Sequence, residues 1–338
     1  MTTKERIQIG FRSVAVLAVA VGLVATSLSP VVHAQAAQNA ANTLKVTPVR
    51  TDIQINPGES KTVATTVSNL TGEPITIRPS SNDFVAGDEQ GTPSLILDEN
   101  QYAPSHSLKR FMGPLADVTI PANGTVSVDV VITVPADAQA GGYFGAVRFS
   151  PSTPDGGGQV NLSASVASII LLTVPGPVTE KLSLTDFTVQ QNGRSNSLFF
   201  NGDNLEVTSR FTSESSIQLG PIGKISVKKG DAVVYESDFN NKTPRDVILP
   251  DSARRWNVPL DQVEGFGHYT VIATYTYGQN NQTIEATASF WVIPWYVIAI
   301  AGAILLLIIA AIIITLLIIR KRRKQTTRVN SNRSGLRL

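Results

Sequence analysis

Hydrophobic and polar residues alternate with a period of two through most of the chain between residues 44 and 293. The clearest run is residues 125–134, where Val126, Val128, Val130, Ile132 and Val134 share one face and Thr125, Ser127, Asp129, Val131 and Thr133 share the other. Successive side chains of a strand point to opposite faces of a sheet, so this pattern predicts strands with one buried face. Shorter runs at residues 61–68, 74–78, 143–149 and 160–174 are separated by turn residues. We therefore expect an all-β fold of immunoglobulin-like sandwiches.

Pro175, Gly176 and Pro177 interrupt this pattern and mark a domain boundary. The run before them is almost continuously apolar from Ala164 to Val174. By itself it also suits a helix, but its β-branched residues and the closing Pro175-Gly176-Pro177 favour a central strand. Beyond the boundary, residues 269–277 and 284–292 alternate again in the manner of half-buried strands. The sequence therefore predicts two tandem β-sandwich domains, at residues 44–177 and 178–293.

A run of 25 residues without a charge occupies residues 295–319. About 20 apolar residues cross the hydrocarbon core of a bilayer as a helix, so the run predicts a single transmembrane helix. The residues expected to anchor it at the two membrane interfaces are Trp291, Trp295 and Tyr296 at one end and Arg320, Lys321, Arg322, Arg323 and Lys324 at the other. Because Lys and Arg resist translocation, residues 320–338 are expected to form a basic cytoplasmic tail.

The first 34 residues have the layout of an export signal. Lys4, Arg6 and Arg12 form a basic segment, residues 14–28 are apolar, and Ala34 ends a small-residue cleavage pattern. We expect cleavage after Ala34, with an uncleaved anchor as the alternative, and a flexible leader at residues 35–43. Either outcome predicts a single-pass plasma-membrane protein with both β-domains outside the cell.

Charge is segregated along the chain. Residues 35–294 hold 17 Lys and Arg against 25 Asp and Glu, whereas residues 320–338 hold eight basic residues and no acidic one. A mildly acidic ectodomain argues against nucleic-acid binding, which requires a basic face. The basic tail suits the anionic headgroups of the bilayer. The chain has no cysteine, which removes thiol catalysis and favours a prokaryotic surface protein.

Two stretches carry a resemblance to a known family: LKVTPVRTDIQINPGESKTVATTVSNLTGEPITI at residues 44–77 and VTIPANGTVSVDVVITVPADAQAGGYFGAVRFS at residues 118–150. They resemble the amino-terminal domain of WxL-interacting cell-surface proteins of Gram-positive-type bacteria. In the second domain only GHYTVIATYTYG and SFWVIPW are similar. The resemblance implies a first domain that binds peptidoglycan and a second domain that binds surface or host proteins.

The ectodomain offers little for catalysis. His106 and His268 are not accompanied by a G-x-S-x-G elbow, an H-E-x-x-H helix or a phosphate-binding loop. Acidic residues crowd one segment, at Asp83, Asp88, Glu89, Asp98 and Glu99. Their oxygens suit calcium, but the spacing does not fit an EF-hand and a solvated acidic loop is the favoured interpretation. We predict no enzyme activity and no cofactor.

Two groups of side chains are candidate ligand contacts. Tyr143 and Phe144 lie in a glycine-rich stretch that would let a partner approach, although core packing at a sandwich corner is the favoured interpretation. Arg254, Arg255 and Trp256 have the composition of interface anchors, although packing on an edge strand is the favoured interpretation. The favoured function is a membrane-anchored cell-surface binding or scaffold protein, with peptidoglycan and surface proteins as partners. A single-pass receptor and a surface hydrolase are the other hypotheses.

Overall fold

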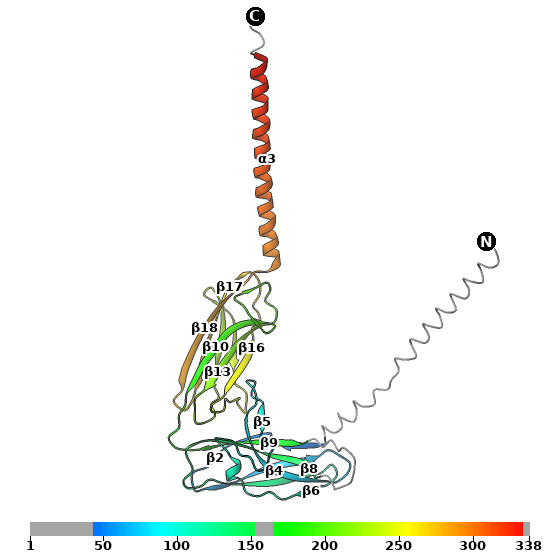
Figure 1. The fold of residues 1–338 in the computed structure, drawn as a ribbon, viewed down its shortest axis with the longest axis vertical. Helices are drawn as coiled ribbons and strands as arrows, with labels where there is room; N and C mark the ends of the chain where they lie inside the picture. Colours follow the sequence, from blue (N-terminus) through cyan, green and yellow to red (C-terminus); the bar gives the residue numbers. More distant parts are fainter. Residues whose placement is uncertain (1–42, 153–164, 334–338) are drawn as a thin grey trace, which may run out of the picture.

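The computed structural model describes residues 43–152 and 165–333. The predicted signal peptide at residues 1–34 and nearly all of the leader at residues 35–43 lie outside these ranges. Two β-sandwich domains follow one another along the chain, and a long helix leaves the second domain on the side away from the first (Figure 1). The all-β fold with two tandem sandwiches and an apolar helix is therefore confirmed.

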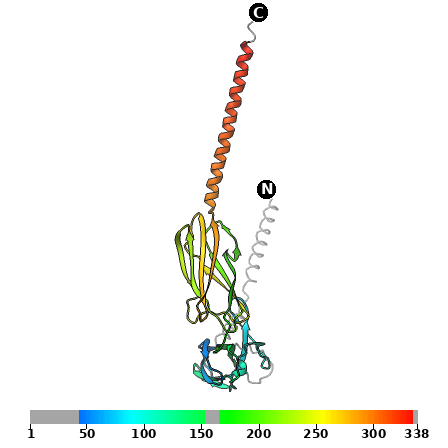
Figure 2. The same cartoon turned by 90° about the vertical axis from the view of Figure 1, so that its left-hand side faces the viewer.

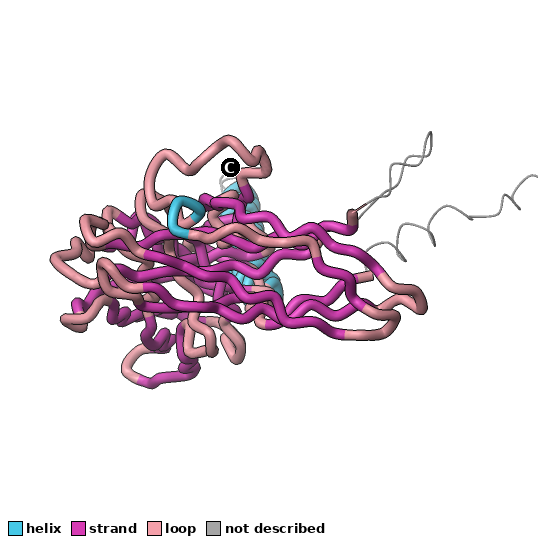
Figure 3. Tube along the Cα trace, turned by 90° about the horizontal axis from the view of Figure 1, so that it is seen from below, coloured by secondary structure: helices cyan, strands magenta, loops and turns pink. Residues whose placement is uncertain are grey.

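Domain 1 is a sandwich of two sheets. Its strands are β1 (Leu44–Thr47), β2 (Arg50–Gln54), β3 (Ser60–Asn69), β4 (Ile75–Ala86), β5 (Pro93–Leu95), β6 (Val118–Ile120), β7 (Thr125–Thr133), β8 (Gly141–Pro151) and β9 (Val166–Val174), with a short 3₁₀ helix η1 (Lys109–Phe111) between β5 and β6. One sheet has the order β1-β3-β7, and the other has the order β2-β9-β8-β4-β5 with β6 on β4. Figure 3 looks along the molecule onto this domain, whose strands run across the view.

The alternation predicted for residues 125–134 is confirmed in β7. Val128, Val130 and Ile132 are buried in the domain 1 core, while Ser127 and Asp129 are exposed. The strand predicted at residues 74–78 is longer in the structure, because β4 continues through a polar stretch to Ala86. That extension is possible because the buried polar side chains within it find hydrogen-bond partners, as described below.

The prediction of a central strand before the boundary is confirmed in β9, which lies between β2 and β8. Ile170 and Leu172 point into the domain 1 core, whereas Ile169 and Leu171 belong to a second apolar cluster on the opposite face. Val247 and Leu249 of domain 2 pack against that second cluster. The run is apolar on both faces because one covers the core of its own domain and the other covers the neighbouring domain.

Domain 2 is also a two-sheet sandwich. Its strands are β10 (Leu182–Gln191), β11 (Arg194–Ser195), β12 (Leu198–Phe199), β13 (Leu205–Ser213), β14 (Ile222–Lys229), β15 (Ala232–Phe239), β16 (Ala253–Pro259), β17 (Gly267–Tyr277) and β18 (Gln282–Val292). The sheet orders are β11-β10-β13-β16 and β12-β18-β17-β14-β15. In domain 1 the strands run crosswise to those of domain 2 (Figures 1 and 2).

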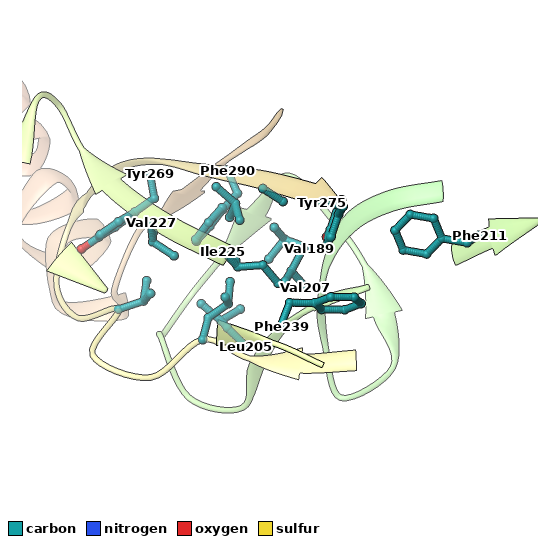
Figure 4. Close-up of a cluster of buried hydrophobic side chains, with 14 of the residues drawn as sticks. Val189, Leu205, Val207, Phe211, Ile225, Val227, Phe239, Tyr269, Tyr275 and Phe290 are labelled. Carbon is teal, nitrogen blue, oxygen red and sulfur yellow. The ribbon is translucent and has the colours of Figure 1, made fainter. Parts of the chain in front are cut away.

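The core of domain 2 is rich in aromatic side chains (Figure 4). The ring of Tyr275 meets Phe239 at a centroid distance of 4.8 Å and Phe211 at 5.0 Å, in edge-on orientations. Nearer the helix, Tyr269 stacks on Phe290 at 5.4 Å. Such pairs stabilise a core beyond the area that they bury. The alternation predicted for residues 269–277 is confirmed, since Tyr269, Tyr275 and Tyr277 are all buried.

Two residues, Ile293 and Pro294, separate the end of β18 from the start of helix α3 (Trp295–Arg333). Its segment Trp295–Lys321 is long and apolar enough to cross a bilayer. The helix does not end where the apolar run ends at Ile319, but continues through the basic residues to Arg333. The hydroxyl of Thr315 donates to the carbonyl oxygen of Ala311 at 2.7 Å, so this polar group within the apolar run is satisfied inside its own helix.

Candidate functional site

A hairpin from domain 1 reaches across to domain 2. It is formed by the end of β4 and by β5, and it rises from domain 1 toward domain 2 in Figure 1. At its tip one carboxylate oxygen of Asp88 accepts hydrogen bonds from the backbone N–H groups of Gln90 at 2.8 Å and Thr92 at 3.0 Å. The hydrogen bond from the Thr92 backbone is the main cause that lowers the pKa of Asp88. The tip is thus a fixed turn that holds the next residue, Glu89, in one orientation.

Glu89 binds two arginines of domain 2. One carboxylate oxygen accepts from Nη2 and Nε of Arg210 at 2.6 and 2.9 Å, and the other lies 3.3 Å from Nη2 of Arg255. The backbone carbonyl of Glu89 also accepts from the backbone N–H of Arg255 at 2.6 Å. The side-chain hydrogen bond between Arg210 and Glu89 is the main reason why the pKa of Glu89 is lowered and the pKa of Arg210 is raised. We call Glu89, Arg210 and Arg255 the interdomain clamp.

Arg254 supports the clamp from within domain 2. Its guanidinium lies 3.1 Å from a carboxylate oxygen of Asp246, donates to the carbonyl of Val247 at 2.8 Å, and stacks over the ring of Trp256 at 4.9 Å. Burial lowers the pKa of Arg254, and Asp246 opposes that effect. The hairpin residue Gly91, with φ at +90°, lies directly against this guanidinium. A Cβ at residue 91 would require the Arg254 guanidinium to move.

Further contacts close the interface on either side. Arg50 of domain 1 donates to the carbonyl of Arg245 at 2.7 Å. Near the Pro-Gly-Pro link, the backbone N–H of Gly142 donates to the carbonyl of Ser216 at 2.8 Å, and the Gln218 amide donates to the Thr173 hydroxyl at 3.0 Å. Together with the apolar cluster on β9, these contacts fix the angle between the domains.

A cleft of about 380 Å³ lies between the domains beside the clamp. Its apolar walls come from Phe84, Ile169 and Leu171 of domain 1 and from Val247 and Leu249 of domain 2. Its charged lining residues are Arg50, Asp88, Lys242, Asp246 and Arg254. The charges of this lining are paired in part within the protein, because Lys242 and Arg254 both contact Asp246. The lining suits binding of a ligand with both apolar and polar groups.

A second, shallower groove of about 450 Å³ lies on the outer side of domain 1. The ring of Tyr102 is 44% exposed and has the cations of Lys109 and Arg110 over it, at 5.0 and 4.7 Å from the ring centroid. Across the groove, Arg78 and Asp117 form an ion pair at 3.5 Å. An exposed ring with hydroxyl, ammonium and carboxylate groups around it is suited to a polar polymer.

The structure places the predicted contact residues at the interface and in the core. Arg254 and Arg255 lie at the interface between the two domains of this chain. Trp256 instead packs on Phe211 and Phe239 in the domain 2 core from β16, an edge strand, in agreement with the edge-strand interpretation. The ring of Phe144 is only 3% exposed and packs on Phe84, so no ligand can reach it. The hydroxyl of Tyr143 donates to the carbonyl of Gln139 at 2.8 Å, and burial raises its pKa.

The acidic segment is not one cluster. Asp83 is fully buried, so the prediction of a solvated loop is wrong for this residue. Its carboxylate accepts from the Ser107 hydroxyl at 2.6 Å and from the backbone N–H groups of Ala103 and Lys109 at 2.9 Å. Asp88 and Glu89 lie at the hairpin tip, while Asp98 accepts from the backbone of Asn100. The sequence crowds these carboxylates together, and β4 and its hairpin then separate them.

The two histidines have local packing roles in the structure. Nδ1 of His106 lies 2.6 Å from the carbonyl oxygen of Gly142, and its ring packs on Phe144. The ring of His268 lies 5.0 Å from that of Trp291. The predicted anchors Trp291, Trp295 and Tyr296 are exposed around the start of α3, and Arg320 and Lys321 are exposed at the far end of the apolar segment. Arg322, Arg323 and Lys324 continue the helix.

No protein-family model and no curated protein matches this sequence. Among solved structures, the chain is similar to a chain of the chaperone–tip adhesin complex of CFA/I fimbriae biogenesis, at 12% identity and a TM-score of 0.36, over 74% of this chain and 99% of that chain. It is similar to the E. coli chaperone DraB at 15% identity and a TM-score of 0.30, over 73% and 96%. A PapD-like domain of human CEP192 matches at 12% identity and a TM-score of 0.28, over 45% and 97%. These scores are too low to transfer a function, which must follow from the residues of this chain.

Proposed function

We propose that this chain is a membrane-anchored cell-surface binding protein, in which α3 is the anchor and the two sandwiches form an extended binding arm. The interdomain clamp is the observation that carries the proposal. It fixes domain 1 to domain 2, and only Ile293 and Pro294 separate domain 2 from α3. An enzyme gains little from such an arm, whereas a scaffold needs it to hold a binding surface at a set distance from the membrane.

Domain 1 is the wall-binding domain of this proposal. Peptidoglycan is a polyhydroxy chain whose peptides carry carboxylates and amines. The groove around Tyr102 offers matching charged groups in Arg78 and Glu99, while the Lys109 ammonium donates to the backbone carbonyls of Glu99 and Gln101 and so holds the wall of the groove. The sequence resemblance of residues 44–77 and 118–150 to WxL-interacting proteins supports the same assignment and implies a Gram-positive-type cell. Surface or host proteins are the second partner class, and the interdomain cleft is the surface proposed for them.

Sedimentation with wall sacculi tests the first partner. The intact chain, reconstituted in nanodiscs, should leave the supernatant with isolated sacculi. Tyr102→Ala should weaken that binding several-fold, because it removes the exposed ring of the groove. Tyr235→Ala in domain 2 makes the same chemical change away from the groove and should bind as the parent does. A parent chain that stays in the supernatant would exclude wall binding, and equal binding by both variants would exclude the groove.

Protease shaving of intact cells tests the topology. The proposal puts domains 1 and 2 outside the cell and the basic end of α3 inside, because Lys and Arg resist translocation. Digestion of both domains on intact cells is expected. Survival of the domains until the cells are lysed would reverse the proposed orientation.

A further inference from the structure

Four loops of domain 2 gather where α3 leaves the domain. The strand register puts the β10–β11 turn, the segment after β12, the β14–β15 turn and the loop before β17 at one end, because Gln191 pairs with Leu205, Lys229 with Tyr269 and Gly267 with Val292. Figures 1 and 2 show this end of the domain facing the start of the helix. We call it the base of domain 2.

The base carries more exposed aromatic surface than a water-facing end needs. Phe200 is 57% exposed, Phe266 49% and Trp291 43%, and the rings of Phe266 and Trp291 lie 6.1 Å apart. Trp295 and Tyr296, on the first turn of α3, are also exposed and line one groove together with Phe200. Exposed apolar residues gathered at one end of a domain mark an interaction surface. Phe200 and Phe266 lie outside any sequence run that points to a membrane, so the alternation of residues along the chain does not reveal them.

The link between domain 2 and α3 is too short to hold the base away from a bilayer that α3 crosses. Ile293 donates to the carbonyl of Phe199 at 2.7 Å, and the Pro294 carbonyl accepts from Val297 at 2.9 Å, so the link is bonded at both of its ends. Two extended residues span at most about 7 Å. The headgroup layer of one leaflet is about 5–8 Å thick, the difference between the whole bilayer and its hydrocarbon core, halved. A domain tied this closely to Trp295 therefore meets the headgroups.

We propose that the base of domain 2 is seated in the headgroup layer of the outer leaflet, with Phe200, Phe266 and Trp291 inserted beside Trp295 and Tyr296. The partner is the lipid surface itself, and the proposal rests on α3 being the membrane anchor. Amphipathic and aromatic rings favour this layer. Seating at these points around the helix holds domain 2 upright, so that the clamp can hold domain 1 at a fixed height.

Charge does not drive this seating. The charged residues of the base are Arg194, Lys228, Lys229, Asp203, Glu206, Asp231, Asp261 and Glu264. Carboxylates outnumber the basic groups, so anionic headgroups do not attract the base. Insertion of the rings must therefore supply the contact, and that contact should not respond to salt, since salt screens only charge–charge attraction.

Site-directed spin labelling can test the seating directly, because the chain contains no cysteine. Single labels are placed by Phe200→Cys and Phe266→Cys in the full chain, reconstituted in phosphatidylcholine nanodiscs. Leu70→Cys in domain 1 is the matched exposed apolar control, and Leu306→Cys within α3 reports the hydrocarbon core; both residues are exposed in the structure. Accessibility to lipid-soluble oxygen is measured relative to a water-soluble nickel chelate, at low and high salt.

The oxygen-to-nickel ratio is expected to be several-fold higher at positions 200 and 266 than at position 70, at either salt concentration. Ratios at 200 and 266 equal to that at 70, with position 306 in hydrocarbon, would overturn the seating and leave the anchor intact. A ratio at 306 equal to that at 70 would instead overturn the anchor, and the proposed function with it. A several-fold difference that disappears in high salt would show an electrostatic contact and would also overturn the proposal.

Discussion

Glu89 of domain 1 accepts two hydrogen bonds from Arg210 of domain 2 through one carboxylate oxygen, at 2.6 and 2.9 Å. The two residues are 121 positions apart in the chain. Each side chain is partly exposed, at 39% for Glu89 and 27% for Arg210. Solvent therefore screens the pair, and its contribution must be found by measurement of the docking equilibrium rather than inferred from the distance.

We expect Glu89→Gln to loosen the two domains without unfolding either one. A double-mutant cycle with Arg210→Met should give a coupling energy of about 0.5–1 kcal/mol, the range of partly exposed ion pairs. The readout is the width of the distance distribution between spin labels at Leu70→Cys and Val233→Cys. Glu236→Gln is the control, because Glu236 pairs with Lys224 inside one sheet of domain 2. An unchanged width in Glu89→Gln would show that the clamp does not set the domain angle.

The same label pair should respond to pH in one direction. The Arg210 hydrogen bond holds the pKa of Glu89 below the ordinary value of 4.5 that it takes when the domains separate. A carboxyl with a lowered pKa stabilises the docked state fully above pH 4.5 and loses that effect as the pH falls through the docked value. The distribution should therefore broaden only below about pH 4.5. In Glu89→Gln this broadening at low pH should be absent. If the distribution still broadened in that variant, another carboxyl would be responsible.

Gly91 provides a test of the packing beside the clamp. A Cβ at this position would collide with the guanidinium of Arg254, and φ is +90°. Gly193→Ala is the matched control, because Gly193 has φ at +76° and open space where a Cβ would lie. Backbone strain alone should cost about 1–2 kcal/mol in either variant. Gly91→Ala should additionally widen the interdomain distribution, and equal behaviour of the two variants would mean that Arg254 moves aside freely.

The sequence predicts what depends on local periodicity and length. The alternation in residues 125–134 and the uncharged run from Trp295 each produce the expected element. Composition makes Arg254, Arg255 and Trp256 candidate ligand contacts, but it cannot show that the two arginines meet the other domain of the same chain or that Trp256 packs on the domain 2 core. The Glu89–Arg210 contact depends on how far β4 extends and on the angle at which the two sandwiches cross. Neither feature leaves a periodic pattern of residues in the sequence. Asp83 was misjudged for the same reason, since its three donors come from residues 103–109 and only the fold brings them together.

Asp83→Asn should destabilise domain 1. The carboxylate is fully buried; one of its oxygens accepts from Ser107 and Ala103 and the other accepts from the backbone N–H of Lys109. The asparagine oxygen can replace the first of these oxygens, but the amide nitrogen would then face the Lys109 N–H and leave this buried donor unpaired, which costs about 1–3 kcal/mol. Denaturant unfolding of the full chain in micelles should show the domain 1 transition shifted and the domain 2 transition unchanged. Asp98→Asn, at an exposed turn, is the control and should cost under about 1 kcal/mol; a similarly small cost for Asp83→Asn would contradict its structural role.

Tyr275 gives domain 2 a dependence on alkaline pH. Its ring is fully buried among Phe211 and Phe239, and its hydroxyl lies 2.6 Å from the Ser209 hydroxyl. Burial is the main cause that raises its pKa from 10.0 to about 12. A group whose pKa is raised on folding stabilises the fold below its unfolded value, so this contribution is complete below pH 10 and is lost between pH 10 and about 12. Two pKa units correspond to about 2–3 kcal/mol at most.

The absorbance of tyrosinate should therefore include a late step from Tyr275 that is absent in Tyr275→Phe, whereas Tyr143, whose pKa burial also raises, should be unaffected by this substitution. Tyr275→Phe should also destabilise domain 2 by about 1–2 kcal/mol at neutral pH, because the buried Ser209 hydroxyl loses its partner. Tyr235→Phe is the matched control, since the hydroxyl of Tyr235 donates to the Pro259 carbonyl at the surface and has no buried partner to leave unpaired. If the titration step assigned to Tyr275 were unchanged in Tyr275→Phe, it would belong to another residue. The loss of domain 2 stability at high pH would then not come from the tyrosine in the aromatic core.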